Sequence, residues 1–256
     1  MLRKPARTAA STNRNVVFLS DFRAAPRGGT GLEETDFVIV GCGGLGSGIA
    51  ARLAAAGARH FFLVDNGRID DGNLKRLSWA AAEDIGEPKA DRLASYLASR
   101  FSASVVTLPE AAEELEAVRL VMAHVRRPFL IFAVDDARLG RRLVAACHAA
   151  LPEPPPYLYV GPVGARSVVG PLVAGPDDPC PFCSSATDAA GDGEVPASDL
   201  PADKAPIAGL VISQIACQRF THPNALRGKR WWFDPRTGRA ELRSVSKRPD
   251  CEVCNP

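Results

Sequence analysis

Four cysteines of this chain form two matched pairs, Cys180-Pro-Phe-Cys183 and Cys251-Glu-Val-Cys254. Two CxxC pairs far apart in a sequence are the commonest way to build a closed tetrahedral zinc site. A thioredoxin-like redox pair comes without a second copy near the C-terminus, and a disulfide framework requires an oxidising compartment. The spacing therefore predicts one structural zinc ion bound by all four thiolates, with no open coordination position and no chemistry of its own.

A glycine-rich loop, Gly41-Cys-Gly-Gly-Leu-Gly46, is the second group of residues suited to chemistry. It follows an apolar run and precedes an alanine-rich segment, which is the context of a GxGxxG nucleotide loop between a strand and a helix. Asp65 ends the next apolar run, where a dinucleotide enzyme would hold the ribose. On these residues alone, an NAD-dependent dehydrogenase would be the default interpretation.

The polar residues after Asp65 favour a different ligand. Arginine and lysine neutralise phosphate oxygens, and a carboxylate binds Mg²⁺. Taken singly, the basic residues would be solvated surface charges, and Asp135-Asp136 would be a helix N-cap pair. Their joint order beside the glycine loop predicts a triphosphate site with its magnesium ion. The polar residues at these successive loops are Asn73, Arg76, Lys89 and Asp135.

Alternating apolar runs and helical segments must position these groups. Strand, crossover helix and strand repeat three times, which predicts a Rossmann-like, doubly wound, mostly parallel α/β sheet. We expect strands at 36–40, 60–65, 103–108 and 128–133, and helices at 47–56, 88–100 and 139–149.

The pattern changes after residue 152. Residues 184–203 are small, acidic and rich in Pro and Gly, which predicts a mobile crossover loop. Residues 1–30 read as a polar arm, and residues 31–256 as one domain. The remaining expected elements are strands at 157–160, 165–173, 230–233 and 240–245 and a helix at 205–220, and we expect the sheet to end in a C-terminal antiparallel extension.

Composition excludes several classes of protein. With 256 residues and 46% hydrophobic residues, the chain can bury one sizeable core or two small ones. Lys and Arg number 31 against 29 Asp and Glu, so no overall basic field favours nucleic acid or a lipid surface. No apolar run is long enough to span a membrane. No signal core follows Met1, and we expect a cytoplasmic protein.

These motifs together resemble the ThiF/MoeB/HesA family, the bacterial relatives of ubiquitin-activating enzymes. The resemblance extends from about Asn13 to Cys254, and it rests on the combination of GxGGxG, Asn-Leu-x-Arg, Gly-x-Pro-Lys, the Asp after the fourth strand and the paired CxxC knuckles. It implies that Asp65 holds the ribose hydroxyls and that Asp135 binds magnesium. It further implies nucleotide contacts for Gly41, Gly43, Gly44 and Gly46, and phosphate contacts for Asn73, Arg76 and Lys89.

Enzymes of this family adenylate the C-terminal Gly-Gly carboxylate of a small ubiquitin-like sulfur carrier protein. The resemblance therefore implies ATP, Mg²⁺ and a carrier partner. It also implies a homodimer, because the family's N-terminal Asn-Arg pair, here Asn13-Arg14, sends its arginine into the partner subunit's site. A carboxylate that attacks the α-phosphate needs neutralised phosphate charge rather than a strong base. Positioning and electrostatic roles thus fall to Arg14, Arg76, Lys89 and Asp135.

The chain departs from the family pattern at three places. Gly67 stands where a second Asp is usual, and Leu77 stands where Gln is usual. Residues 184–203 lack the cysteine that forms a covalent carrier intermediate in some members, and Ser198 lies near its expected place. The other cysteines are typical of small packed side chains, so we expect adenylation without an enzyme thioester. These cysteines are Cys42, Cys147 and Cys217.

Three functions of different classes follow. The first is adenylation of a Gly-Gly carrier protein, and the second is adenylation of a ribosomal peptide in natural-product biosynthesis. The third is a non-catalytic family scaffold, which the retention of Arg76, Lys89 and Asp135 disfavours. The residues leave the choice between the first two open.

Overall fold

The computed structural model describes residues 31–108, 121–150, 153–163, 166–183, 226–234 and 237–255. The predicted arm at 1–30, the predicted loop at 184–203 and the predicted helix at 205–220 lie outside these ranges. The same holds for Asn13, Arg14, Ser198 and Cys217.

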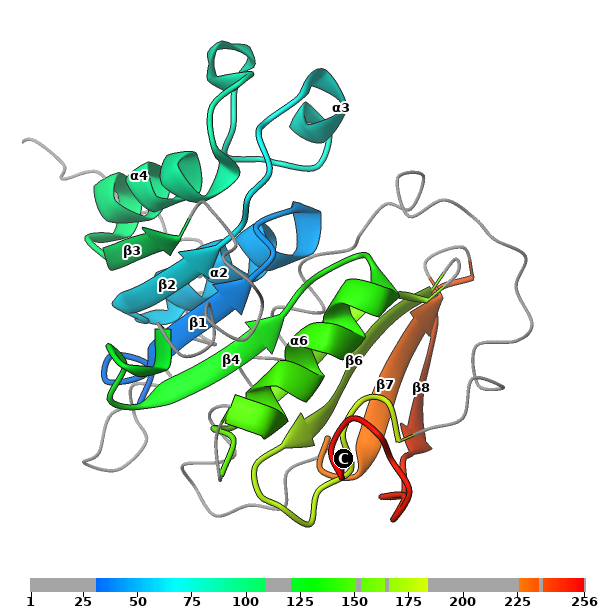
Figure 1. The fold of residues 1–256 in the computed structure, drawn as a ribbon. Helices are drawn as coiled ribbons and strands as arrows, with labels where there is room; N and C mark the ends of the chain where they lie inside the picture. The colour runs from blue at the N-terminus through cyan, green and yellow to red at the C-terminus, as the bar shows by residue number, and fades with distance from the viewer. Residues whose placement is uncertain are drawn as a thin grey trace, which may run out of the picture.

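One eight-stranded sheet runs through the molecule, in the order β3-β2-β1-β4-β5-β6-β7-β8 (Figure 1). The first five of these strands pair in parallel, and the last three pair antiparallel, which confirms the predicted doubly wound half with a C-terminal antiparallel extension. The strands are β1 (Asp36–Val40), β2 (His60–Val64), β3 (Ser104–Leu108), β4 (Pro128–Phe132), β5 (Tyr157–Val163), β6 (Arg166–Val173), β7 (Lys229–Asp234) and β8 (Arg239–Ser244).

The inner parallel strands β1 and β4 are buried on both faces, as their near-continuous apolar sequences predict, whereas the edge strand β3 is exposed or half-buried along its length. Alternate residues of β1 face opposite ways: Phe37 and Ile39 pack with α2 (Gly44–Ala56) and α4 (Lys89–Phe101), whereas Val38 packs with α6 (Ala137–Ala150). The helices thus cover both faces of the sheet (Figure 1). No helix in the described part of the chain is long and apolar enough to cross a membrane.

Two predicted helix starts were late. Helix α2 begins at Gly44 rather than at 47, because the end of the glycine loop already takes helical conformation. Helix α6 begins at Ala137 rather than at 139. The short helix α3 (Asp71–Leu74) and the 3₁₀ turn η1 (Ala82–Asp84) were not predicted, since four- and three-residue elements have no apolar periodicity to reveal them.

The strand order reverses between β1 and β4. The chain leaves β1 for β2 on one side and later returns to place β4 on the other side. Val40 at the end of β1 lies opposite Val64 of β2 and Phe132 of β4, so the loops that follow these three strands meet at one edge of the sheet. Ligands of doubly wound sheets bind at such a switch point, outside the carboxyl ends of the strands.

Candidate nucleotide site and metal centre

The glycine loop begins directly after β1, and the packing of the chain itself requires two of its glycines. Gly41 has a positive φ of 94°, and a Cβ there would lie 2.5 Å from the carbonyl oxygen of Ala133. A Cβ at Gly46 would lie 1.8 Å from the carbonyl oxygen of Gly41. The loop is therefore folded tightly against itself and against the end of β4.

Gly43 differs from these two. Its φ of −70° and ψ of −161° are open to any residue, and a Cβ there would meet no atom within 4 Å. It is the N-cap of α2, and no side chain caps that helix. The start of the 13-residue helix thus presents backbone N–H groups and open space, which is the arrangement that accepts a phosphate. The first residue of the helix is Gly44.

Asp65 joins the glycine loop to the end of β2. The Cys42 N–H donates to its Oδ2 (2.6 Å), and the Gly67 N–H donates to its Oδ1 (2.7 Å). The Cys42 thiol is fully buried, and burial, followed by the charge of Asp65, raises its pKa well above the ordinary value, although Lys89 opposes this. Cys42 is therefore a packed, protonated thiol and not a nucleophile.

The unusual Gly67 lies beside Asp65 and Lys89. A Cβ at Gly67 would come within 2.9 Å of Asp65 Oδ1 and 3.1 Å of Lys89 Nζ. Lys89 is the first residue of α4, and its N–H donates to the Gly67 carbonyl (2.9 Å). The glycine therefore leaves the Lys89 ammonium close to the carboxylate at the end of β2, in space that a side chain at position 67 would occupy.

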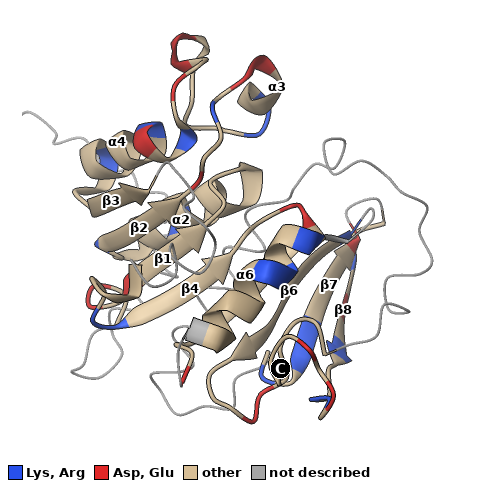
Figure 2. Cartoon of the chain, in the orientation of Figure 1, with Lys and Arg blue, Asp and Glu red and all other residues tan. Residues whose placement is uncertain are grey.

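Helix α3 (Asp71–Leu74) carries Asn73, and Arg76 lies in the turn that follows it. The helix lies beyond the carboxyl ends of β1 and β2 (Figure 1). The Asp70 carboxylate caps it by accepting the Asn73 N–H (2.8 Å). Asn73 is buried and Arg76 is half-buried. Leu77, where the family pattern has Gln, is 1% exposed and belongs to the core. Charged side chains of both signs gather on α3 and the nearby loops, whereas strands β1 to β5 are nearly uncharged (Figure 2).

The two acidic residues after β4 have different roles. Asp136 caps α6, because its Oδ1 accepts the Arg138 N–H (2.8 Å) and the Leu139 N–H (3.3 Å). Asp135 is exposed, and its carboxylate makes no hydrogen bond or ion pair within the described ranges. The N-cap interpretation thus applies to Asp136 and leaves Asp135 able to bind a cation.

The structure brings most of the predicted nucleotide residues to one edge of the sheet. The glycine loop, Asp65 and Lys89 are linked by the contacts above, and the pairing of β1 with β4 places the loop that carries Asp135 at the same edge of the sheet. Asn73 lies in α3 and Arg76 in the turn after it, and among the described residues neither has a side-chain hydrogen bond to the others. Arg14 lies outside the described ranges.

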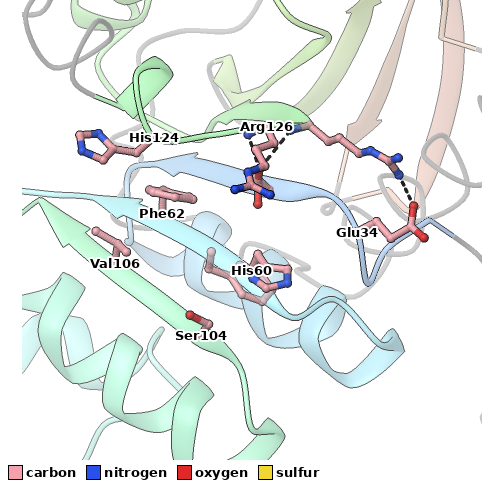
Figure 3. A pocket seen from close by; sticks show the side chains of 10 residues that line it. Glu34, His60, Phe62, Ser104, Val106, His124 and Arg126 are labelled. Carbon is pink, nitrogen blue, oxygen red and sulfur yellow. Dashed lines mark hydrogen bonds and ion pairs between the residues drawn. The ribbon is translucent and has the colours of Figure 1, made fainter.

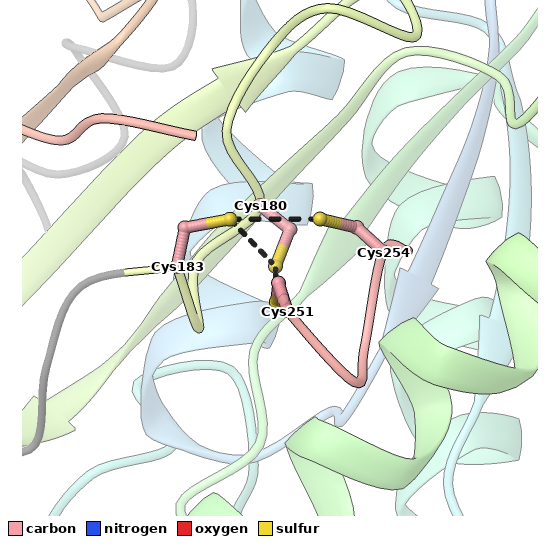
Figure 4. Close-up of side chains that lie close together, drawn as sticks. All are labelled: Cys180, Cys183, Cys251 and Cys254. Carbon is pink, nitrogen blue, oxygen red and sulfur yellow. Dashed lines mark hydrogen bonds between the residues drawn. The ribbon is translucent and has the colours of Figure 1, made fainter. Parts of the chain in front are cut away.

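The four predicted metal ligands form one cluster (Figure 4). Their Sγ atoms all lie within 4.8 Å of one another, with 3.7 Å between Cys180 and Cys251 and 3.5 Å between Cys183 and Cys254. None is in a disulfide. Four sulfurs at Zn–S distances of about 2.3 Å form a tetrahedron with edges of about 3.8 Å. The donor set and its spacing therefore fit a closed zinc site.

Residues that support this cluster were missed from the sequence. Arg230 of β7 is 8% exposed, and it donates to the Pro181 carbonyl within the first knuckle and to the Gly170 carbonyl (3.3 Å). His148 Nε2 lies 2.9 Å from the hydroxyl of the fully buried Tyr157. From the sequence, an arginine in a strand of mixed polarity is expected at the surface. The nearby Trp232, on which Arg230 packs, is the one sequence feature that indicates burial of this strand.

A separate hollow of about 380 Å³ lies at the opposite, amino ends of β1, β2 and β3 (Figure 3). Its rim includes Asp36, whose Oδ2 accepts the N–H groups of Arg126 (2.7 Å) and Arg127 (3.1 Å). Because it lies at the far end of the strands, it is not part of the site around the glycine loop.

Comparison with known proteins identifies the family. Residues 13–253 match the ThiF family, which is nearly the whole chain. The chain belongs to the ThiF family. An adenylyltransferase aligns over most of its length, and the chain is an enzyme of the ThiF adenylyltransferase type.

Two relatives of this ThiF-family chain align over most of their own length. Molybdopterin-synthase adenylyltransferase of Escherichia coli K12 is 24% identical over 87% of this chain and 88% of its own length. SAMP-activating enzyme E1 of Haloferax volcanii is 26% identical over 90% of this chain and 83% of its own length. A local match to the NEDD8-activating enzyme E1 catalytic subunit of Dictyostelium discoideum is 36% identical, but it covers only 35% of this chain and 21% of that protein.

The fold is similar to solved structures of Escherichia coli MccB. The structure of MccB with AMPCPP and MccA superimposes with a TM-score of 0.73 at 20% identity, over 97% of this chain and 76% of that chain. MccB with ATP gives a TM-score of 0.70 at 21% identity, over 94% and 70%. At these identities the likeness establishes the fold, and it does not establish the substrate.

Proposed function

We propose that this chain transfers AMP from ATP to the C-terminal carboxylate of a small ubiquitin-like carrier protein. One observation carries the proposal: Gly43 leaves open space at the start of α2, beside Asp65 and Lys89, in a chain of the ThiF family. The relatives that align over most of the chain are named for adenylyl transfer and for activation of SAMP.

The residues around the loop have separable roles in this reaction. The Asp65 carboxylate accepts ribose hydroxyls while it holds the glycine loop in place. Asn73, Arg76 and Lys89 donate to the phosphates, which keeps the α-phosphate aligned for in-line attack. Asp135 binds Mg²⁺, which supplies charge neutralisation for the departing pyrophosphate.

We propose no enzyme thioester in this pathway. Cys42 and Cys147 are both 0% exposed, and burial raises the pKa of Cys147 to about 12. A thiol of that kind is neither accessible nor ionised at neutral pH. Cys42→Ala and Cys147→Ala should therefore retain the adenylation activity, and no thiol-sensitive conjugate with the carrier should form.

Pyrophosphate exchange into ATP, with and without the carboxylate partner, tests the proposal. Exchange should require Mg²⁺ and the partner, and Asp135→Ala should abolish it. Asp136→Ala is the matched control: it removes a helix cap at a cost of about 1 kcal/mol in stability but should retain exchange. Exchange in Asp135→Ala at the wild-type rate, or no exchange with any Gly-Gly-ended carrier, would refute the assignment.

A ribosomal peptide is the second candidate substrate. The likeness in fold to the microcin C7 biosynthetic enzyme MccB, solved in complex with N-formylated MccA, motivates it. Exchange stimulated by a peptide encoded beside this gene, and not by a Gly-Gly carrier, would select this alternative. Exchange stimulated by neither would favour the non-catalytic scaffold.

We further propose a homodimer in which Arg14 of each subunit enters the other's site. The proposal rests on the match of Asn13-Arg14 to the family's N-terminal pair. Losing one charge-assisted contact to the phosphates commonly costs about 2.7–4 kcal/mol of transition-state stabilisation. Arg14→Ala should slow exchange at least tenfold and leave the dimer intact. A monomer by light scattering would contradict this arrangement.

A further inference from the structure

Helix α6 connects the loop that carries Asp135 with the four-cysteine cluster. The helix begins two residues after Asp135, and its Arg141 reaches both CxxC knuckles. The Arg141 guanidinium carbon lies 6.0 Å from the ring centre of Phe182 in the first knuckle, and its Nη2 lies 3.0 Å from Glu252 Oε2 in the second. Phe182 and Glu252 are not metal ligands. Arg141 therefore contacts both knuckles without touching the four thiolates.

A second connection runs through the buried ring of Tyr159. The ring packs edge-on against Phe182, with centroids 5.5 Å apart and an interplanar angle of 70°. Its other side faces the first turn of α6, where a Cβ at Gly140 would lie 2.7 Å from Tyr159 Cε2 and 3.1 Å from Val134 Cγ2. Tyr159 is only 6% exposed. The ring therefore fits between the knuckle and the helix start with no room for an added methyl group.

The ring contact is the stronger of the two connections. The side chains of Arg141 and Glu252 are 46% and 85% exposed, and an exposed ion pair of this kind contributes little. Tyr159 and Phe182 form an aromatic pair of favourable geometry, and the tyrosine is buried. A packed pair that touches two elements allows few intermediate positions, so displacement of the knuckle must move the helix start.

We propose that the four-cysteine centre, through Phe182 and Tyr159, holds the β4–α6 loop in the position that lets Asp135 bind Mg²⁺. Phe182 and Tyr159 are positioning residues, and an ordered zinc site sets the affinity of the distant nucleotide site. The effect on ATP rests on the function proposed above, whereas the effect on the loop does not.

Hydrogen exchange of the loop tests the coupling without nucleotide. The N–H groups of Arg138 and Leu139 bond to the Asp136 side chain, and the Gly140 N–H bonds to its carbonyl (2.9 Å), so their exchange reports the loop directly. In Phe182→Ala these amides should exchange about tenfold faster, in the range typical of coupled sites, with zinc content unchanged. Mg-ATP affinity should fall by a similar factor.

Three further variants separate coupling from general damage. Phe182→Tyr keeps the ring and should behave as wild type. Gly140→Ala should accelerate exchange at the same amides, because its methyl group displaces Tyr159 from the helix side. Arg142→Ala, the next arginine of α6, should leave exchange and Mg-ATP affinity unchanged.

The outcomes distinguish this inference from the proposed function. Wild-type exchange in Phe182→Ala with a full complement of zinc would overturn the coupling and leave the adenylation proposal standing. Faster exchange with unaltered Mg-ATP affinity would also overturn it, since the loop would then not control the nucleotide site. If the wild-type protein binds no Mg-ATP, the proposed function fails, and with it the inferred consequence for affinity.

Discussion

Two glycines of the glycine loop, Gly43 and Gly46, allow its role in folding stability to be measured separately from its role in nucleotide binding. Alanine at Gly46 would place a Cβ 1.8 Å from the Gly41 carbonyl oxygen, whereas real Cβ contacts are essentially never under 3.0 Å. The backbone of the loop must therefore move by more than 1 Å. Alanine at Gly43 would meet no atom within 4 Å. The two substitutions add the same methyl group to the same loop, so their comparison is controlled.

The expected stabilities follow from these distances. Overpacking a tight site costs about 1–3 kcal/mol, so Gly46→Ala should lower Tm by roughly 2–12 °C in a domain of this size. For Gly43→Ala, the loss of a glycine N-cap costs about 1 kcal/mol, and the lower entropy of the unfolded chain offsets about 0.4–1 kcal/mol. The free energy of unfolding of Gly43→Ala should thus stay within about 1 kcal/mol of wild type.

Binding of Mg-ATP should be weakened by Gly43→Ala, the variant whose stability changes little. The methyl group of Gly43→Ala points into the space assigned to the phosphates, and Kd should rise at least about tenfold, equivalent to 1.4 kcal/mol, in a protein of nearly normal Tm. Thermal unfolding and titration calorimetry measure the two quantities on the same samples. Unchanged Kd in Gly43→Ala would refute the assignment of the loop, and unchanged Tm in Gly46→Ala would refute the steric argument.

Two further predictions concern the metal centre and pH. Cys251→Ser should reduce zinc content and lower Tm sharply, because apparent binding energies of structural zinc, about 10 kcal/mol, are comparable with the whole stability of a domain. Unchanged zinc content by elemental analysis, or unchanged Tm by calorimetry, would contradict this prediction. Burial and, second, the charge of Lys247 lower the pKa of His148 from 6.5 in the folded state. The unfolded state therefore binds the proton more readily, and stability is lost as pH falls through about 6.5. His148→Gln should show a smaller drop in Tm between about pH 8 and pH 5.5, and an equal drop would show that other groups control acid stability.

Local patterns were sufficient to predict the parallel half of the sheet. Apolar runs such as 128–133 must be buried on both faces, and the glycine loop between strand and helix has few alternative structures. The pairing of Cys180 with Cys251, which are 71 residues apart, was also predictable, because a zinc ion imposes the contact whatever the intervening chain does.

Other features depend on distant packing and had no local signal. Adjacent Asp135 and Asp136 look identical in sequence, and only the start of α6 at Ala137 makes the second one the cap. In the sequence, Gly140 looks like an ordinary residue of low helix propensity. The structure shows that a larger residue there would collide with the ring of Tyr159. Burial of Arg230 depends on the carbonyls of Gly170 and Pro181 in separate segments, which no periodicity shows.

The sheet combines pairings of very different sequence separation. Only a few residues separate β7 from β8 and β5 from β6 in the sequence, whereas Asp36 of β1 pairs with Pro128 of β4, which lies much further along the chain. Contacts between near neighbours form quickly, and distant parallel pairings form slowly. During refolding, the antiparallel hairpins should gain protection from exchange well before β1 and β4 meet. The crevice at their carboxyl ends is then among the last features to form, so nucleotide binding would report completion of the fold rather than an early intermediate.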